Sequence, residues 1–507
     1  MTKRKHEISN PSINKHSEVL AIIGVNIIDV LEKTVHENSI IICRGGKIDK
    51  IGSAESISIP ENAEVLKLSG RYILPGLIDA HVHLAHPGVD DYGKISMESM
   101  TKKYLRHSFL TLKSGVTTIR NMPGSFGYSI LKFRDQVNAR KYIGPRIFAS
   151  GPALSAPYGY FSLKRFIPAP PVLLKLLSVI FGAHGLSVDI DKPQEVPKVI
   201  QELKKAGVDF IKTTTPGAYL SLIENDPDSR EFYTKRKVDP RLLDASMRPE
   251  VLKAIVKYSH DEGLKVSAHS ICLPEGIKQA VEAGVDSIEH TPLGLIDGET
   301  FKRMKETGIY WVPTAYCFNH WADLIENPDL FSRQEMKDAI SEPYHSMGKK
   351  ALEKQREAIK SGADPNWVKF YAEMPNYKQK YFPVNFENAI KSGVKIVAGV
   401  DSGMGGAGYV PHGFLYKELE LFVKHGMDEY EAIRTATVNA AELLDAADEL
   451  GSIDQGKIAD FVILRANPIK DISDLCQVEY VIKDGRIVHS DIQQNKKQEE
   501  IIMRHVK

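Results

Sequence analysis

Short apolar runs alternate with amphipathic stretches through most of the chain, from residue 71 to residue 444. Several amphipathic stretches, such as residues 196–206 and 274–283, are followed at once by a glycine, the residue that most often ends a helix. This alternation is typical of repeated βα units around a parallel sheet. Eight apolar runs qualify as strands, at residues 72–83, 116–120, 146–150, 209–212, 266–269, 287–290, 311–314 and 394–401. Because a TIM barrel has eight strands, we predict an α/β fold with a (β/α)₈ barrel over residues 71–444.

The flanking segments, residues 19–70 and 445–490, have a different pattern, in which short strand-like runs are separated by tight turns. In the first segment Gly45-Gly46 separates two apolar runs, which is a hairpin signal. In the second, Asp484-Gly485 follows a strand-like run and tolerates the positive φ of a two-residue turn. We therefore predict one small, discontinuous β-sandwich domain, built from both segments, with the barrel inserted between them.

Four further segments lie outside these patterns. Residues 1–18 are polar and basic without a following apolar core, and we interpret them as a disordered leader, while residues 491–507 form a charged tail. Residues 315–390 make the gap before the last strand far longer than one helix needs, which predicts an insertion at the carboxyl face of the barrel, as a substrate lid or an oligomer contact. The apolar segment 166–182 is too short to span a bilayer; a buried or lid helix is favoured, with an interfacial membrane contact as the alternative.

Composition narrows the class of partner. The 66 Lys and Arg residues against 65 Asp and Glu give a net charge of +1. This charge is too small to create a strong electrostatic field that would attract nucleic acid or an anionic membrane. The four cysteines form no Cys-x-x-Cys pair, which favours a reducing compartment, and we expect a cytoplasmic location. A small molecule is the expected partner, and the oligomeric state stays open between a monomer and a homo-oligomer.

The candidate chemistry lies at the ends of the predicted strands. The first strand ends in His81-Val82-His83, and residues i and i+2 of a strand point to the same side. His269, His290 and Asp401 each end another strand. Side chains from different strand ends converge at the carboxyl mouth of a barrel, so these residues predict a nitrogen and oxygen shell for a divalent ion, with zinc as the first candidate.

Lys212 ends the fourth predicted strand and allows two interpretations. A lone lysine at a strand end is more often solvated or ion-paired. A cation facing metal ligands is unfavourable, however, and a neutral amine can add CO₂ to become a carbamate, whose two oxygens can bridge two metal ions. Lys212 thereby becomes a candidate N6-carboxylysine ligand.

Together these residues resemble the amidohydrolase superfamily, in particular its imidazolonepropionase-like and prolidase-like members, which hydrolyse acyl-amino-acid or dipeptide bonds. The resemblance covers about residues 19–488. It rests on a series of motifs: LPGLIDAHVHL (74–84), GVTTIRN (115–121), ASGPALS (149–155), AGVDFIK (206–212), GLKVSAHS (263–270), GVDSIEH (284–290), AGVDS (398–402), PHG (411–413), EAIRTATVNAAELL (431–444) and LGSIDQGKIADFVIL (450–464).

The resemblance implies a binuclear metal centre. In it, His81, His83 and Asp401 would hold the first ion, His269 and His290 would hold the second, and carboxylated Lys212 would bridge the two. The chain departs from the family at Asn121, where relatives often have Asp, in the loop 156–160, and in the long insertion. These departures concern the identity of the substrate and leave the metal ligands in place.

The reaction expected from this centre is hydrolysis of an amide or related C–N bond by a hydroxide that bridges the two ions. Asp401 would take up the proton of the attacking water and return it to the leaving amine. Arg120, Tyr219 and His412 lie at or after strand ends and are candidate substrate-binding residues, while Tyr158 and Tyr160 are candidates to line the pocket.

Two alternatives remain open at this stage. A one-metal deaminase or cyclic-amide hydrolase of the same superfamily needs His81, His83, His269 and Asp401 but no carbamate, so Lys212 is the discriminating residue. The other alternative is a non-catalytic scaffold built on the same barrel, against which the complete ligand set argues.

Overall fold

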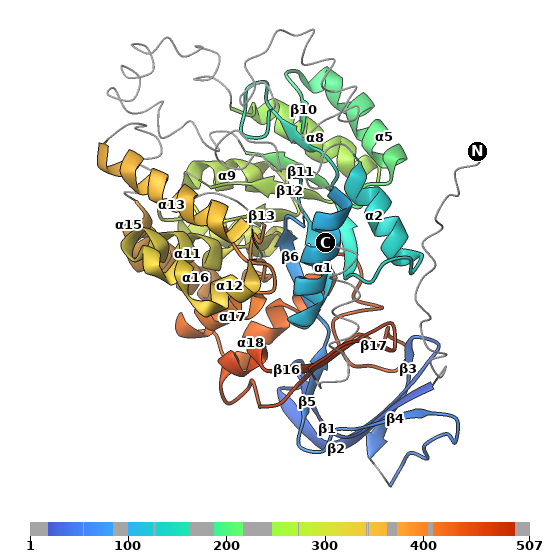
Figure 1. Cartoon of the computed structure of the whole chain (residues 1–507). Coiled ribbons are helices and arrows are strands. Elements are labelled where there is room, and N and C mark those ends of the chain that lie inside the picture. The colour runs from blue at the N-terminus through green and yellow to red at the C-terminus, as the bar shows by residue number, and fades with distance from the viewer. Residues whose placement is uncertain are drawn as a thin grey trace, which may run out of the picture.

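A computed structural model places the larger part of the chain, as residues 19–53, 55–84, 100–124, 128–162, 187–215, 246–271, 273–340, 342, 344–361, 373–403 and 409–491. Figure 1 shows a sheet at one end of the molecule and a body of helices and parallel strands above it. The leader 1–18, the apolar segment 166–182, Tyr219 and almost all of the predicted tail lie outside the described residues. Among the helices within those ranges, none combines the length and apolar character needed to cross a bilayer.

The sheet at the end of the molecule is built from both terminal segments. Its strand order is β17-β16-β15-β5-β1-β2-β3, and β4 also pairs with β1. β15 pairs antiparallel with β5, so the N-terminal and C-terminal strands lie side by side, as their blue and red colours show in Figure 1. The strands are β1 Val19–Asp29, β2 Thr34–Arg44, β3 Lys47–Ser53, β4 Glu64–Lys67, β5 Tyr72–Pro75, β15 Phe461–Leu464, β16 Val478–Lys483 and β17 Arg486–Ser490.

Apolar alternation and turn chemistry explain this terminal sheet. Ile22, Ile73 and Phe461 belong to one apolar cluster and are fully buried. The predicted turn at Asp484-Gly485 is confirmed: φ is +49° at Asp484 and +70° at Gly485, and the turn joins β16 to β17. The predicted division into a sandwich domain and a barrel domain stays a prediction.

Parallel strands form the second part of the fold and confirm the α/β class. One sheet has the order β6-β7-β8 and the other β10-β9-β11-β12-β13-β14, and every pairing within them is parallel. Seven of the eight predicted strands have a counterpart here, but the first is divided: Tyr72–Pro75 is β5 of the terminal sheet, and only Leu77–Val82 lies here as β6. The short β9 and β10 are additional. The strands are β6 Leu77–Val82, β7 Val116–Asn121, β8 Arg146–Ala149, β9 Ala153–Ser155, β10 Ser187–Asp189, β11 Ile211–Thr214, β12 Val266–His269, β13 Ser287–Glu289 and β14 Tyr310–Val312.

The eighth predicted strand, residues 394–401, takes part in isolated bridges instead of a continuous strand. Its backbone accepts from Trp311 of β14 at Lys395, at 2.9 Å, and from Ala80 of β6 at Ala398, at 3.0 Å, so it lies between the two sheets. The approach is close: a Cβ on Gly399 would lie 2.8 Å from the Cβ of His81, which explains a glycine here. On the other side, the N–H of Asp209, just before β11, donates to the carbonyl of Ala149 at the end of β8, at 2.9 Å, so the two sheets are also linked there.

Helices follow most of the parallel strands and cover them (Figure 1). α5 and α9 end at Gly207 and Gly284, both in the left-handed conformation, which confirms the predicted glycine ends. The insertion holds α11 to α16. The helices are α1 Met100–Lys113, α2 Ser129–Asn138, α5 Val196–Ala206, α8 Pro249–Asp261, α9 Pro274–Ala283, α10 Gly298–Thr307, α11 Ala315–Glu326, α12 Gln334–Ala339, α13 Tyr344–Ser361, α15 Met374–Asn376, α16 Phe382–Ser392, α17 Leu415–Lys424, α18 Glu429–Thr435 and α19 Val438–Leu443, with shorter helical turns η1 Pro193–Glu195, η3 Pro328–Ser332, η4 Tyr377–Tyr381 and η5 Ile472–Cys476.

Candidate metal centre

His81, His83 and Asp401 form a compact buried group at the carboxyl ends of the parallel strands. Asp401 Oδ1 lies 3.4 Å from His81 Nε2 and 3.1 Å from His83 Nε2. One donor atom from each residue can be chosen so that all three lie within 4.8 Å of one another. Two imidazoles and one carboxylate at this separation can share one divalent ion.

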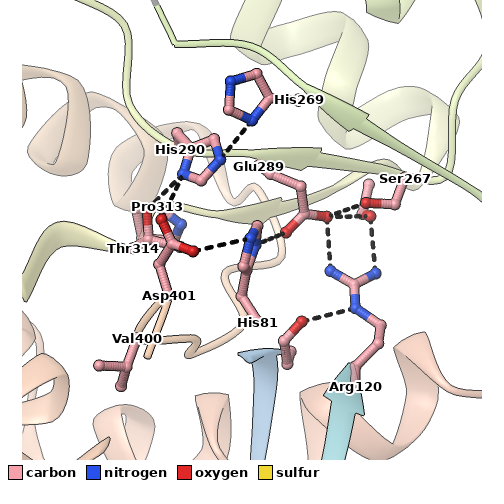
Figure 2. A network of polar contacts seen from close by, with 12 residues as sticks. His81, Arg120, Ser267, His269, Glu289, His290, Pro313, Thr314, Val400 and Asp401 are labelled. Atoms are coloured by element: carbon pink, nitrogen blue, oxygen red, sulfur yellow. Dashed lines mark hydrogen bonds and ion pairs between the residues drawn. The ribbon is translucent and has the colours of Figure 1, made fainter. Parts of the chain in front are cut away.

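His290 and His269 lie beside this group (Figure 2). His290 Nδ1 is 4.0 Å from Asp401 Oδ2, and His290 Nε2 is 2.8 Å from His269 Nδ1. The His290 and His81 rings are 4.8 Å apart between centroids. The structure therefore brings together the four predicted histidines and Asp401 from β6, β12, β13 and the 394–401 segment.

The backbone has an unusual conformation at three positions around this group, just after β13, just after β14 and at the end of the 394–401 segment. His290, Thr314 and Asp401 are not glycine, yet their φ angles are +75°, +47° and +62°. Thr314 Oγ1 also lies 2.8 Å from His290 Nδ1. Residues other than glycine rarely adopt this left-handed backbone conformation. Those that do cluster at functional sites, where surrounding contacts hold the backbone in place.

Lys212 of β11 is almost fully buried, and its Nζ has no hydrogen-bond partner among the described residues. Burial lowers the pKa of Lys212 to about 8; Arg120 acts in the same direction, and Glu289 and Asp401 oppose it. A larger fraction of the amine is therefore neutral near neutral pH than for an exposed lysine. The neutral amine is the form that carbamate formation requires.

Electrostatics favour metal-binding protonation states. Burial, followed by the charge of Lys212, lowers the pKa of His81 to about 4, and burial also lowers the pKa values of His269 and His290. Burial alone would raise the pKa of Asp401, but the adjacent His81 and His83 rings outweigh it and hold that pKa below its ordinary value. Neutral imidazoles and an ionised carboxylate are the forms that bind divalent ions.

A second observation also fits the binding of divalent ions, namely candidate ligand atoms that are buried without a hydrogen-bond partner. Lys212 Nζ and His269 Nε2 are buried atoms without a hydrogen-bond partner in the described part of the chain. Buried polar atoms are nearly always satisfied, so two unsatisfied nitrogens in one region are consistent with positions that a bound ion would fill.

The sequence reasoning missed Glu289, which is fully buried behind His81. Glu289 Oε2 lies 2.7 Å from His81 Nδ1 (Figure 2). The GVDSIEH motif contains this residue, but the alternation of side chains along a regular strand would place a glutamate next to His290 on the opposite face, so the motif gives no signal for this contact.

Arg120, predicted to bind substrate, is buried in the interior. Its guanidinium donates to Ala80 O at 2.7 Å, Ser287 Oγ at 2.9 Å and Glu289 Oε1 at 2.6 Å (Figure 2). Because these internal acceptors occupy the guanidinium, the structure gives no support to the predicted contact with a substrate carboxylate. Tyr219 lies outside the described residues.

His412, the third predicted substrate residue, is buried beside the metal ligands. Its ring stacks on His107 with centroids 4.2 Å apart, and neither ring nitrogen has a hydrogen-bond partner in the described ranges. Tyr160 stacks on His269 at 4.3 Å, while Tyr158 lies in the same loop with φ at +62°. The predicted roles of these residues at a pocket stay predictions.

Cys317 of α11 also reaches the group. Its Sγ lies 3.7 Å from Asp401 Oδ2, within hydrogen-bond distance for sulfur. Burial raises the pKa of this thiol well above its ordinary value, so the thiol keeps its proton and donates to Asp401. No sequence motif indicates this contact, because Cys317 lies in the insertion.

Comparison with known proteins agrees with this geometry. The family model described as "Amidohydrolase family" matches residues 72–488. Ochratoxinase from Aspergillus niger is 27% identical over 432 residues, which cover 82% of this chain and 75% of that protein.

Solved structures give the same result. The crystal structure of a Xaa-Pro dipeptidase with methionine bound in its active site is 26% identical, with a TM-score of 0.67, and the match covers 93% of this chain and all of that one. The crystal structure of Aspergillus niger ochratoxinase matches with a TM-score of 0.65 at 22% identity, covering 94% of this chain and 97% of that one, which shows a shared fold.

Proposed function

This chain belongs to the amidohydrolase family and is a hydrolase of C–N bonds, and from that premise we propose that it cleaves the amide bond of an acyl-amino acid, a dipeptide or a related small molecule. The observation that carries the proposal is the convergence of His81, His83 and Asp401 within 4.8 Å. The similarity to a dipeptidase over nearly the whole chain supports a substrate with a peptide-like amide.

We further propose that the parallel strands close into a (β/α)₈ barrel. The backbone hydrogen bonds from Trp311 to Lys395 and from Ala80 to Ala398 support closure on one side. The hydrogen bond from Asp209 to Ala149 supports it on the other. The metal ligands then lie at the carboxyl mouth, where barrel enzymes bind their substrates.

In this proposal the site holds two divalent ions, with zinc as the first candidate. His81, His83 and Asp401 would hold one ion, His269 and His290 the other, and N6-carboxylated Lys212 would bridge them. Bound ions would supply Lewis-acid polarisation of the scissile carbonyl and an acidified water. The burial of Lys212, with an unpartnered Nζ, supports the bridging role.

The residues of the chain divide the remaining work. Asp401, held ionised by its neighbours, is placed to accept a proton and return it to the leaving amine. The S–H group of Cys317 donates to Asp401 Oδ2 and would help to orient this carboxylate. His412, with two unpartnered ring nitrogens in a buried position, is the proposed donor to a polar group of the substrate.

A one-metal deaminase or cyclic-amide hydrolase is the second candidate function. It is favoured by one observation: among the described residues, a single group of three histidine and acidic side chains, His81, His83 and Asp401, satisfies the distance expected around one ion. Such an enzyme would not need Lys212, so this residue separates the two candidates.

The test is metal content per chain by elemental analysis, on protein purified with bicarbonate and without chelator. The variants are Lys212→Ala and, as a matched control, the exposed Lys253→Ala. About two ions in the parent and the control, falling in Lys212→Ala, would support the bridged site and justify assays of acyl-amino acids and dipeptides. One ion in all three proteins would favour the one-metal enzyme, and no ion in the parent would contradict both.

A further inference from the structure

The carboxylate of Glu289 has its two oxygens in different surroundings. Oε1 accepts from Arg120 at 2.6 Å, Ser267 Oγ at 2.7 Å and Ser287 Oγ at 2.7 Å. Oε2 lies 2.7 Å from His81 Nδ1 (Figure 2). Three donors on one oxygen hold the carboxylate plane in place, so the other oxygen is held at the His81 ring.

This arrangement determines which nitrogen of His81 keeps a proton. An ionised carboxylate can only accept hydrogen bonds, so His81 Nδ1 must donate. Nε2, on the other side of the ring, lies 3.4 Å from Asp401 Oδ1 and is the nitrogen that faces the metal group. A histidine that binds a metal commonly donates its second N–H to a carboxylate, which orients the ring and raises its basicity.

The buried ion pair between Arg120 and Glu289 keeps the Glu289 carboxylate in contact with His81. Glu289 is fully buried and the Arg120 side chain is 3% exposed, so neither can exchange its partner for water. Burial alone would leave a carboxylate protonated, and the guanidinium of Arg120 is the nearest compensating charge. His83, by contrast, donates from Nδ1 to the neutral carbonyl of Pro123.

We propose that Glu289, anchored by Arg120, is a positioning residue that holds the proton of His81 on Nδ1 and presents Nε2 as the metal-binding atom. The inference rests on the proposed metal centre, and it assigns to Arg120 an internal role in place of substrate binding. It also separates the two ligands of the His81-Val82-His83 motif, since His81 Nδ1 faces a carboxylate whereas His83 Nδ1 faces a backbone carbonyl.

The backbone explains how Glu289 and His290 can both reach the site. Consecutive residues of a regular strand point to opposite sides. β13 ends at Glu289, and the left-handed φ of His290, +75°, turns the chain there. Both side chains thereby approach His81, one on Nδ1 and the other with its ring 4.8 Å away.

The first experiment measures the dissociation constant of Zn²⁺ for the full-length chain by competition with a chromogenic chelator. Glu289→Gln keeps the shape of the side chain but removes its charge, and we expect the dissociation constant to rise about 10–100-fold. Arg120→Gln should raise it through loss of the anchor. The matched control, Glu306→Gln, changes an exposed glutamate of α10 and should leave it unchanged. Equal affinities in the parent and a folded Glu289→Gln protein would overturn the proposal.

The second experiment does not depend on metal, and it reads the tautomer in the parent protein itself. Long-range ¹H–¹⁵N correlations of the metal-free parent, labelled on histidine, show which ring nitrogens carry protons, and His81→Asn identifies the His81 signals. We expect a hydrogen-bonded proton on Nδ1. A His81 ring with its proton on Nε2 alone would overturn the inference. A parent that binds no Zn²⁺ at all would contradict the proposed function instead, and the two failures are therefore distinguishable.

Discussion

The terminal sheet and the carboxyl ends of the parallel strands are both buried, but they bury different side chains. In the terminal sheet, Ile22, Ile73 and Phe461 are fully buried and belong to one apolar cluster. At the strand ends, Lys212 and Glu289 are as thoroughly buried, although both carry ionisable groups. Burying a charge costs free energy unless the charge is paired. Burial at the strand ends therefore stabilises the fold less than burial in the terminal sheet does.

The same contrast appears in the backbone. Asp484 of the terminal sheet has positive φ in a two-residue hairpin turn, where Asp is well tolerated. His290, Thr314 and Asp401 have positive φ at fully buried positions, and two of them are candidate metal ligands. Positive φ in a hairpin turn serves to reverse the chain. Positive φ at buried polar residues indicates a functional site, where contacts with the surrounding fold hold the strained backbone.

The largest expected effect is the loss of activity in Asp401→Asn. The substitution keeps the size of the side chain but removes the proton acceptor, so we expect turnover to fall about 10²–10⁴-fold or more. Far-ultraviolet circular dichroism should be unchanged. Metal content must be measured with turnover, because Asp401 is also a proposed ligand. Asp261→Asn, at an exposed position of α8, is the control, and near-normal turnover in Asp401→Asn would rule out the proton-transfer role.

The opposite result is expected in the terminal sheet. Phe461→Ala removes a fully buried ring, and we expect the free energy of unfolding to fall by about 3–5 kcal/mol. Urea unfolding gives this value. The Zn²⁺ dissociation constant of the folded fraction should equal that of the parent, because Phe461 packs in a separate cluster from the metal ligands. A changed dissociation constant would show that the two regions are coupled.

These two regions also differ in how well sequence predicts them. Strand alternation and turn residues predicted the terminal hairpins, and strand-end positions predicted which histidines converge with Asp401. Both patterns depend on regular backbone geometry. The 394–401 segment was predicted as a strand, but it makes only isolated bridges, because it bonds to β14 through Lys395 and Val397 and then to β6 through Ala398 and Asp401, so neither pairing forms a continuous ladder.

The errors fall where the backbone departs from regular geometry. Glu289 was missed because alternation places it opposite His290, and no sequence signal gives the positive φ of His290. Arg120 was predicted to face the substrate because it ends a strand, but the buried charge of Glu289 requires a partner and Arg120 supplies it. A long-range ion pair cannot be read from the sequence of either strand alone.

A pH dependence of stability provides a third test, in metal-free protein. The pKa of His81 is about 4 in the folded chain, mainly because of burial, against about 6.5 when unfolded. Between these values the unfolded state binds more protons, so the stability contribution is present above pH 6.5 and is lost as the pH falls towards 4. The loss from this residue is about 3 kcal/mol. Urea unfolding at several pH values should show a steeper decline in the parent than in His81→Asn, and parallel declines would contradict the assignment.

The smallest expected effect concerns an ion pair that joins the terminal sheet to α18. Lys33 lies in the turn between β1 and β2, and its Nζ is 2.9 Å from Asp428 Oδ2 and 3.1 Å from Glu431 Oε1 of α18. The Lys33 side chain is 44% exposed, so water and salt screen the pair, and Lys33→Met should lower the free energy of unfolding by at most about 1 kcal/mol. The difference should shrink in 1 M NaCl. Because Asp428 still caps α18 through the Glu431 N–H, neither Zn²⁺ affinity nor turnover should change, and a change in either would mean that the terminal sheet helps to hold the site.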